Sequence, residues 1–219
     1  MNHLGMFAKY WQAGSVKTRL AESIGEVAAS QIYFHCLESL LQRFGDQGDI
    51  RTVVYCPPEN KVDFVTVADE RWQIAPQSSG DLGVRMRHFF ENAFEQGATR
   101  VVLIGSDSPT VPRLWIQRAW QMLHRCKVVL GPATDGGYYL VGMSEFVPAI
   151  FEDVRWSTSH VLEETRSKLT EAGLACIELP TWYDVDGMDD LRQLRQELAE
   201  GPPGDGDWTK LRVAIDDVI

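Results

Sequence analysis

The stretch RVVLIGSDSPTVP, residues 100–112, joins an apolar run to an unusual ending. The run is typical of a strand that is buried on both faces. Gly-Ser-Asp-Ser-Pro follows it, although an ordinary turn needs only one such residue. The stretch therefore predicts a buried strand that carries one rigidly held carboxylate, Asp107, to the edge of a sheet.

Similar apolar runs alternate with segments of helical periodicity along the chain. Further strands are predicted at 4–8, 51–56, 71–77, 127–133, 135–143, 174–179 and 182–186. Helices are predicted at 26–44, 60–69, 82–96, 113–124, 157–173 and 189–199, with a serine or threonine cap on the helix from residue 157. This alternation predicts an α/β fold, a three-layer α/β/α sandwich with a mostly parallel central sheet.

Composition narrows the class of protein. The 219 residues carry a net charge of −10, which argues against a general nucleic-acid binder. The four cysteines have no zinc-site spacing and are typical of reduced core residues in a cytoplasmic protein. We find no secretion signal and no apolar run of membrane-spanning length.

The sequence contains no linker before residue 200. We therefore expect one domain over residues 1–200 and a C-terminal tail over 201–219, which opens with the breaker-rich EGPPGDGD. The final segment, 208–219, is able to pack back onto the body. No pattern specifies an oligomer interface.

Candidate functional residues follow the predicted strands, because α/β folds bind ligands beyond the carboxyl ends of their strands. The first strand leads into a loop with Lys9, Gly14, Lys17 and Arg19. Cations before a helix N-terminus suit phosphate groups. The segment is not the phosphate loop of nucleotide hydrolases, because Val16 stands where that motif needs glycine. A solvated basic loop is the alternative.

A second loop, QSSGDLGVRM (77–86), has two glycines that would let its backbone approach a flat ligand. Gln77 could offer an amide to the edge of a base, close to Gly80. The alternative is an ordinary helix entry with Asp81 as its cap.

Two acidic segments predict a metal site. Magnesium bound to a diphosphate takes only one or two protein carboxylates. Asp107 can supply one, or it can simply close a turn. Asp184 and Asp186 lie two apart in an extended segment and so face the same side. We favour Asp107 with Asp186 as the metal ligands, and Asp184 as the next candidate.

The segment GPATDGGYYLVG (131–142) places an acid before two glycines. Gly136 permits a positive φ or a close approach to a ligand. Asp135 could bind a sugar hydroxyl or act as a base. The alternative is a tight turn into a strand.

Taken in order, six blocks resemble the signature of an uncharacterised bacterial glycosyltransferase-A-like family of the nucleotide-diphospho-sugar transferase superfamily, also known as the radical-SAM/selenodomain-associated transferase type. The blocks are FAK…GSVKTRL, QSSGDLGVRM, GSDSPTVP, GPATDGGYYLVG, WST and YDVDGMDDL, within residues 4–198. The resemblance implies the nucleotide-diphospho-sugar transferase (GT-A) fold. The family's usual first-loop prolines are replaced by Tyr10 or Trp11 and by Ala13.

The resemblance implies a ligand class more clearly than a reaction. Our first hypothesis is a Mg²⁺- or Mn²⁺-dependent transferase that uses a nucleotide-activated donor, with a nucleotide sugar as the first choice. It would transfer the sugar to an acceptor that the sequence does not identify. The nucleotide would be held by Phe7, Ala8, Lys9, Gly14, Lys17, Arg19, Gln77 and Gly80.

Two alternatives stay open at this point. KTRL is similar to the KSRL of phospholactate guanylyltransferases, and GSDSP resembles the GDxP of molybdenum-cofactor nucleotidyltransferases. The protein could therefore join an NTP to a phosphorylated small molecule and release pyrophosphate. It could also be a catalytically degenerate nucleotide-binding protein.

Overall fold

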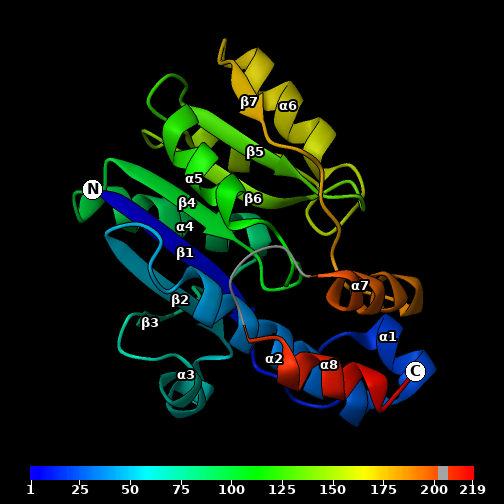
Figure 1. Cartoon of the computed structure of the whole chain (residues 1–219). Coiled ribbons are helices and arrows are strands. Elements are labelled where there is room, and N and C mark those ends of the chain that lie inside the picture. Colours follow the sequence, from blue (N-terminus) through cyan, green and yellow to red (C-terminus); the bar gives the residue numbers. More distant parts are fainter. Residues whose placement is uncertain (202–206) are drawn as a thin grey trace.

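The computed structural model describes residues 1–201 and 207–219. These residues form a seven-stranded sheet in the order β3-β2-β1-β4-β6-β5-β7 (Figure 1). The strands are β1 Asn2–Lys9, β2 Ile50–Cys56, β3 Gln73–Pro76, β4 Arg100–Ile104, β5 Val128–Pro132, β6 Tyr138–Met143 and β7 Cys176–Glu178. Only β6 runs antiparallel to its neighbours, β4 and β5, among the strand pairs of the described residues. The predicted mostly parallel sheet is confirmed.

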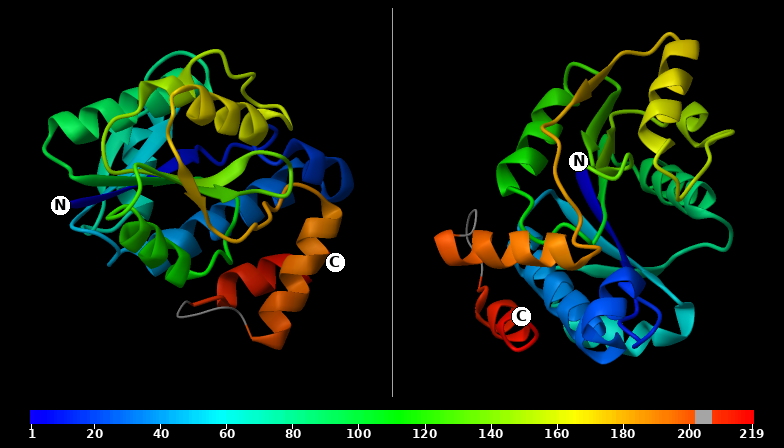
Figure 2. Two further views of the ribbon diagram at one scale, coloured as in Figure 1. Left: turned by 90° about the horizontal axis from the view of Figure 1, so that it is seen from above. Right: turned by 90° about the vertical axis from the view of Figure 1, so that its right-hand side faces the viewer.

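Eight helices and two short 3₁₀ turns accompany the strands in the described ranges, and α7 and α8 follow the last strand. The helices are α1 Thr18–Ile24, α2 Glu26–Phe44, α3 Lys61–Val67, α4 Leu82–Glu95, α5 Arg113–Met122, α6 Val161–Glu171, α7 Met188–Glu200 and α8 Thr209–Asp216. The 3₁₀ turns are η1 Pro58–Asn60 and η2 Pro148–Phe151. Helices α2, α3 and α5 cover one face of the sheet, and α4, η2 and α6 cover the other (Figure 2). These are the three layers that the alternation predicts.

Two predicted elements differ from the structure. The segment 182–186 is extended, but only Trp182 forms a bridge, with Ala133. It lies beside residues that follow the end of β5, where no strand remains to build a ladder. Helix α6 begins at Val161 rather than at residue 157, and no side chain caps it. The hydroxyl of Thr158 instead donates to the carbonyl of Arg155 within the preceding turn.

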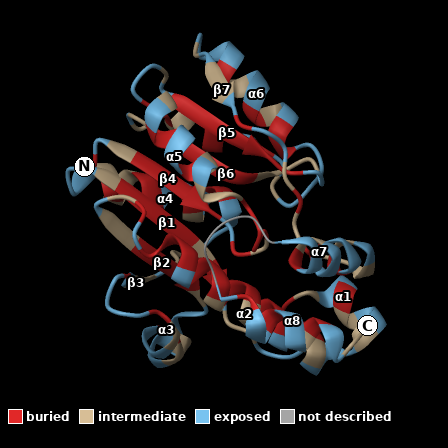
Figure 3. Ribbon diagram, in the orientation of Figure 1, coloured by how far each residue is buried: buried red, intermediate tan, exposed pale blue. Residues whose placement is uncertain are grey.

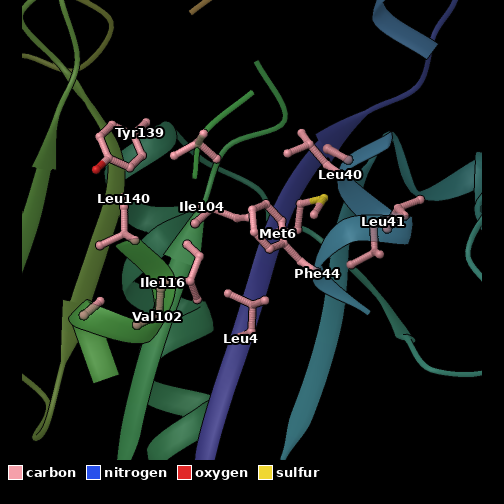
Figure 4. Close-up of a cluster of buried hydrophobic side chains, with 14 of the residues drawn as sticks. Leu4, Met6, Leu40, Leu41, Phe44, Val102, Ile104, Ile116, Tyr139 and Leu140 are labelled. Carbon is pink, nitrogen blue, oxygen red and sulfur yellow. The ribbon is translucent and has the colours of Figure 1, made fainter. Parts of the chain in front are cut away.

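Strand β1 shows how the sheet is held between the layers. Leu4 and Met6 pack into the core beneath α2 and α5, together with Phe44 of α2 (Figure 4). The opposite face of β1 meets Phe89 of α4. Gly5 makes this contact possible, because a Cβ there would lie 2.2 Å from the Phe89 ring. The central strands are buried along their length (Figure 3), as expected for a sheet that is covered on both faces.

A third core lies among α1, α2, α7 and α8. Trp208, Leu211 and Ile215 bring α8 onto α2 and are buried there. Part of the predicted C-terminal tail is therefore a packed helix, while the breaker-rich residues 202–206 lie outside the described residues.

Two further expectations concern chemistry and location. All four cysteines are free, with Cys36 buried and the other three half-buried. Among the described residues, no helix is long and apolar enough to cross a bilayer.

Candidate functional site

The candidate site lies along the edge where the parallel strands end. Because β1, β2, β3, β4 and β5 run in one direction, their carboxyl ends share an edge, and β6 begins there. The segments that follow these strands bring residues distant in sequence together. In Figure 1 the first turns of α1 and α7 lie beyond this edge.

Asp107 and Asp186 meet at this edge on a single cation. The Lys17 Nζ donates to Oδ1 of Asp107 and to Oδ1 of Asp186, the latter at 3.1 Å. The backbone reinforces the pairing, because the N–H of Val185 donates to the carbonyl of Asp107 at 2.9 Å. The two carboxylates that we expected to share a metal therefore converge on one point.

Lys17 points inward rather than toward solvent. Its side chain is 3% exposed, whereas those of Asp107 and Asp186 are 45% and 42% exposed. It precedes α1 in the left-handed conformation, at φ 50°. Burial opposes its charge, but the carboxylates of Asp107 and Asp186 outweigh burial and raise the pKa of Lys17 above its usual value. In this state the ammonium is an internal partner of the two acids.

Asp184 lies just behind this pair. Its carboxylate accepts a hydrogen bond from the hydroxyl of Ser108. Burial, followed by the nearby charge of Asp107, raises the pKa of Asp184 to about 7. Asp135 adds to the same effect, which places its charge at the same edge. Asp184 is thus an acid whose burial favours its neutral form to a higher pH than is usual for an aspartate.

Two residues of α2 hold the ends of β1 and β4. The Tyr33 hydroxyl accepts from the N–H of Lys9 and hydrogen-bonds the hydroxyl of Ser106, both at 2.8 Å. The second residue, Arg43, is buried and donates to the carbonyls of Pro109 and Val111. These bonds fix both ends of the turn that carries Asp107.

Sequence reasoning missed Arg43, although a signal was present. It is an arginine among the apolar residues that repeat at helical spacing along α2. Such a residue is almost never buried unless it is paired. The ring of Trp208, the residue that precedes α8, covers its guanidinium at 4.9 Å, so the start of the C-terminal helix contacts the support of the Asp107 turn.

A basic group lies at the other end of the edge, around the end of β2. Burial raises the pKa of the Cys56 thiol, and the positive charges of Arg85 and Lys9 oppose that rise. Both cations therefore lie near this thiol. Arg85 donates to the carbonyl of Gly80 at 2.8 Å and to the side-chain oxygen of Gln77 at 3.2 Å. Sequence reasoning overlooked Arg85, although it lies inside the QSSGDLGVRM block.

The cations of this basic group, and Arg19 in the first turn of α1, lack acidic partners. Within residues 1–201 and 207–219, neither Lys9, Arg19 nor Arg85 forms an ion pair. Lys9 and Arg19 are exposed, the latter in the first turn of α1. Of the predicted phosphate-binding cations, the structure thus presents two outward and turns Lys17 inward.

Gln77 has a structural task of its own. Its amide nitrogen donates to the carbonyls of Val54 and Ala8, at 3.0 and 3.3 Å. Both N–H groups are therefore used to tie the loop to β1 and β2, and the amide has no free donor for a base. The alternative role for Asp81 is present, because its carboxylate caps α4 by accepting from the N–H of Val84. Gly80 has φ 114°, close to this cap.

The remaining predicted residues occupy turns or strand ends. Asp135 is exposed and accepts from the N–H of Gly137 at 2.8 Å. Gly136, at φ 90°, lets the backbone at Ser159 approach, because a Cβ would lie 2.1 Å from that carbonyl oxygen. Gly14 is exposed in its loop, at φ 80°. Phe7 is half-buried against Phe89, and Ala8 is buried on the opposite face of β1, in the core with Leu4 and Met6.

The first loop lacks the expected prolines and is anchored differently. The ring of Trp11 packs against Phe34 and Phe64, with ring centroids 4.7 and 5.3 Å apart. The N–H of Tyr10 donates to the carbonyl of Cys56 at 2.7 Å. Aromatic packing and a backbone bond thus position this loop.

The donors at the edge suit a metal that brings other ligands with it. In the described residues, no group of three or more histidine, cysteine or acidic side chains could enclose an ion. Two carboxylates converge instead, and a cation already occupies the point between them. This donor set fits Mg²⁺ or Mn²⁺, because such ions keep waters and bind phosphate oxygens beside one or two carboxylates.

A separate cavity of about 370 Å³ lies between α2, α3 and α8. Its charged lining is largely paired, through His35 with Glu38, Arg71 with Asp69, and Lys210 with Glu38. It does not adjoin the acidic pair, so the candidate site remains the sheet edge.

Comparison with known proteins supports this fold. Residues 40–158, more than half of the chain, match the family described as "Uncharacterized protein conserved in bacteria (DUF2064)". This protein belongs to the DUF2064 family. A structure from Desulfovibrio desulfuricans, described as a "putative nucleotide-diphospho-sugar transferase", is similar to the DUF2064 protein over 99% of this chain and 94% of its own, with 32% identity and a TM-score of 0.90.

More distant structures share the fold of the DUF2064 protein. One is the 4-diphosphocytidyl-2C-methyl-D-erythritol synthase from Anaerococcus prevotii, with a TM-score of 0.59, 10% identity, and coverage of 90% of this chain and 99% of its own. Another is Rv0371c from Mycobacterium tuberculosis in complex with manganese, with a TM-score of 0.51, 15% identity, and coverage of 89% and 98%. No curated protein sequence matches the chain significantly. The predicted nucleotide-diphospho-sugar transferase fold is confirmed, whereas the radical-SAM-associated type stays a prediction.

Proposed function

We propose that the DUF2064 protein is a Mg²⁺- or Mn²⁺-dependent transferase that uses a nucleotide-activated donor, with a nucleotide sugar as our first choice. One observation carries the proposal. Asp107 and Asp186, from distant parts of the chain, converge on a single cation at the carboxyl edge of the sheet. A cation bound by two half-exposed carboxylates there suits a diphosphate leaving group.

The acidic pair would supply the metal ligands. When bound, a divalent ion would stabilise the negative charge that develops on the leaving diphosphate. Asp107 and Asp186 would orient that ion from one side, because each has one oxygen turned to Lys17 and a side chain half open to solvent. The fold relative from Mycobacterium tuberculosis was solved with manganese, which is in keeping with this assignment.

The basic group would hold the donor. Lys9, Arg19 and Arg85 have no acidic partner in the described ranges and can neutralise phosphate oxygens. The nucleoside would lie against the strand ends near Phe7 and Ala8. Backbone groups around Gly80 would contact the base, because the amide donors of Gln77 already serve backbone carbonyls.

Asp135 would act on the acceptor. Its carboxylate is exposed, at the edge that Asp107 and Asp184 share. One oxygen is held by the N–H of Gly137, which leaves the other to accept a proton or a hydrogen bond from an acceptor hydroxyl. In a glycosyl transfer the acceptor oxygen would then bond to the sugar carbon as the bond to the diphosphate breaks.

Nucleotidyl transfer is the second candidate, and the unpaired cations favour it. Three cations without acidic partners exceed what a metal-bound diphosphate needs and suit a triphosphate. In that reaction a phosphate oxygen of the acceptor attacks the α-phosphorus, and the bond to the β-phosphate breaks to release pyrophosphate.

A thermal-shift panel of nucleotide sugars and NTPs, with and without Mg²⁺ or Mn²⁺, tests the proposal. A ligand that binds only the folded state raises the Tm. We expect a shift that needs the metal, followed by turnover that releases a nucleoside diphosphate or, for the second candidate, pyrophosphate. No shift with any donor would refute the proposal. Tight binding of a nucleotide without turnover of any donor would make the protein a degenerate nucleotide binder.

A further inference from the structure

Lys17 occupies the very position where the two acidic side chains would meet a metal. Its Nζ contacts Oδ1 of Asp107 and Oδ1 of Asp186. The ammonium lies beneath the pair, 5.8 Å from the centre of the Tyr33 ring. The acidic pair therefore already holds one positive charge before any ligand arrives.

The position of Lys17 has two opposite electrostatic effects, one on the carboxylates and one on a metal ion. Two carboxylates held this close repel each other unless a cation lies between them. Lys17 supplies that cation and so keeps the pair assembled. The same ammonium opposes a second cation, since a divalent ion at these oxygens would be repelled by a neighbouring positive charge.

The phosphates of a donor offer the ammonium another partner. Asp107 and Asp186 are both half exposed, so Lys17 lies only one carboxylate away from solvent. Its four-carbon stem is flexible, and its ammonium is a compact point charge that suits a phosphate oxygen. Lys17 also sits at the junction between the first loop and the seven-residue helix α1.

We propose that Lys17 is an internal competitor for the divalent ion: it holds Asp107 and Asp186 together in the unloaded protein and moves to the donor's diphosphate when the metal enters. This inference rests on the proposed function and adds that metal binding and phosphate binding depend on each other. Metal binding frees the ammonium for the phosphates, and the phosphates draw it away from the metal ligands. By thermodynamic linkage each ligand then raises the affinity of the other.

Mn²⁺ binding in the absence of nucleotide tests the competition. Titrations followed by electron paramagnetic resonance would compare wild type, Lys17→Met and the matched control Lys17→Arg, which keeps a cation. We expect Lys17→Met to bind Mn²⁺ about tenfold more tightly or better, since a tenfold change needs only about 1.4 kcal/mol. We expect Lys17→Arg to stay close to wild type. Equal or weaker binding by folded Lys17→Met would overturn the inference.

Inorganic pyrophosphate tests the second half of the inference. Calorimetry with EDTA should give similar pyrophosphate affinities for wild type and Lys17→Met, because the carboxylates hold the ammonium. With saturating Mn²⁺, wild type should bind pyrophosphate about tenfold more tightly than Lys17→Met. An equal loss in Lys17→Met with and without Mn²⁺ would mean that Lys17 contacts phosphate permanently.

A third measurement needs no variant and so does not depend on whether Lys17→Met folds. Acetic anhydride labelling of wild type, read by mass spectrometry, should leave Lys17 protected without Mn²⁺. Mn²⁺ without pyrophosphate should free Lys17 from the two carboxylates and increase its labelling at least severalfold, and added pyrophosphate should lower that labelling again because it pairs with the ammonium. Unchanged protection would make Lys17 a permanent structural cation.

The outcomes separate this inference from the proposed function. Wild type that binds pyrophosphate and nucleotides, with Mn²⁺ affinity unchanged in Lys17→Met, would refute the competition and leave the function standing. Tighter Mn²⁺ binding by Lys17→Met, in a protein that binds no diphosphate or nucleotide, would support the competition and refute the function.

Discussion

The two halves of the sheet edge are built in opposite ways. The acidic half, made of Asp107, Asp184, Asp186 and the buried Lys17, is internally paired and fixed by backbone bonds. The basic half, around Lys9 and Arg85, is more open and has no acidic partner in the described residues. The difference is that the charges of the acidic half are already paired within the protein, whereas the cations of the basic half have no acidic partner in the described residues.

Their supports differ as well. The turn of Asp107 is held by a buried arginine, Arg43, and by the backbone N–H of Val185, which is also buried. The loop of Gly80 is held by Gln77 and Arg85, which are only partly buried. A buried charged network is costly to break, whereas bonds between exposed groups contribute little. Substitutions should therefore affect the two halves unequally.

The largest effect is expected from Arg43→Met, which should break the acidic half alone. The carbonyls of Pro109 and Val111 would lose their donors inside the core. Two hydrogen bonds to a charged group predict a loss of about 4 kcal/mol in the free energy of unfolding, measured by chemical denaturation. Mn²⁺ affinity should fall too. The control Arg118→Met, at an exposed position, should change stability by less than about 0.5 kcal/mol.

The next effect is expected from Asp107→Asn, which removes one metal ligand. We expect transfer activity to fall about 100-fold, as when one preorganised charge-stabilising group is lost, and the metal-dependent part of the thermal shift to vanish. Asp189→Asn is a matched control, because that exposed acid pairs with Arg192 in the first turn of α7. A metal-dependent shift that survives Asp107→Asn would reduce Asp107 to a turn residue.

A smaller, pH-dependent effect is expected from Asp184→Asn. The folded pKa of about 7 lies above the usual value of 3.8, so the native state binds more protons than the unfolded state between these values. The free energy of unfolding of wild type therefore decreases as the pH rises from about 4 to 7. Asp184→Asn should match wild type near pH 4 and be increasingly more stable than wild type as the pH rises to 8, measured as unfolding free energies. A constant difference across this range would contradict the assignment.

The smallest effects are expected in the basic half. Lys9→Ala and Arg85→Ala should each weaken nucleotide binding about two- to fivefold, without much change in nucleoside binding, because exposed charge pairs contribute up to about 1 kcal/mol. The losses should shrink at high salt. Arg166→Ala, which removes an exposed partner of Glu178, serves as the control. Equal weakening of nucleoside and nucleotide binding would place the phosphates elsewhere.

Much of the fold could be predicted because its signals are local. The apolar runs predicted every strand of the sheet, and the helical periodicity of 26–44 matches α2. The predictions that were wrong depended on neighbouring segments. The segment 182–186 has no partner strand with which to form a ladder. Helix α6 begins only after a turn in which the hydroxyl of Thr158 bonds to the carbonyl of Arg155 instead of capping the helix. Pattern alone does not show which partner a polar or extended segment will find.

The sequence allowed a prediction of where the candidate residues gather, but not of which side chains contact one another. Asp107 and Asp186 could be proposed together, because each follows a segment that ends at the same edge. Arg43 and Arg85 were missed, although one interrupts an apolar helix face and the other lies within a glycine-rich block. The inward turn of Lys17 could not be predicted, because it depends on two carboxylates that lie far away in sequence.

The sequence by itself determined the layers of this protein and the edge at which its acids and cations gather, because periodicity and strand-end chemistry are properties of short segments. Only the tertiary structure decided which charges are neutralised within the protein and which stay without a partner of opposite charge in the described residues. The physical reason is that pairing and burial depend on distances between segments, and these distances exist only once the sheet has assembled.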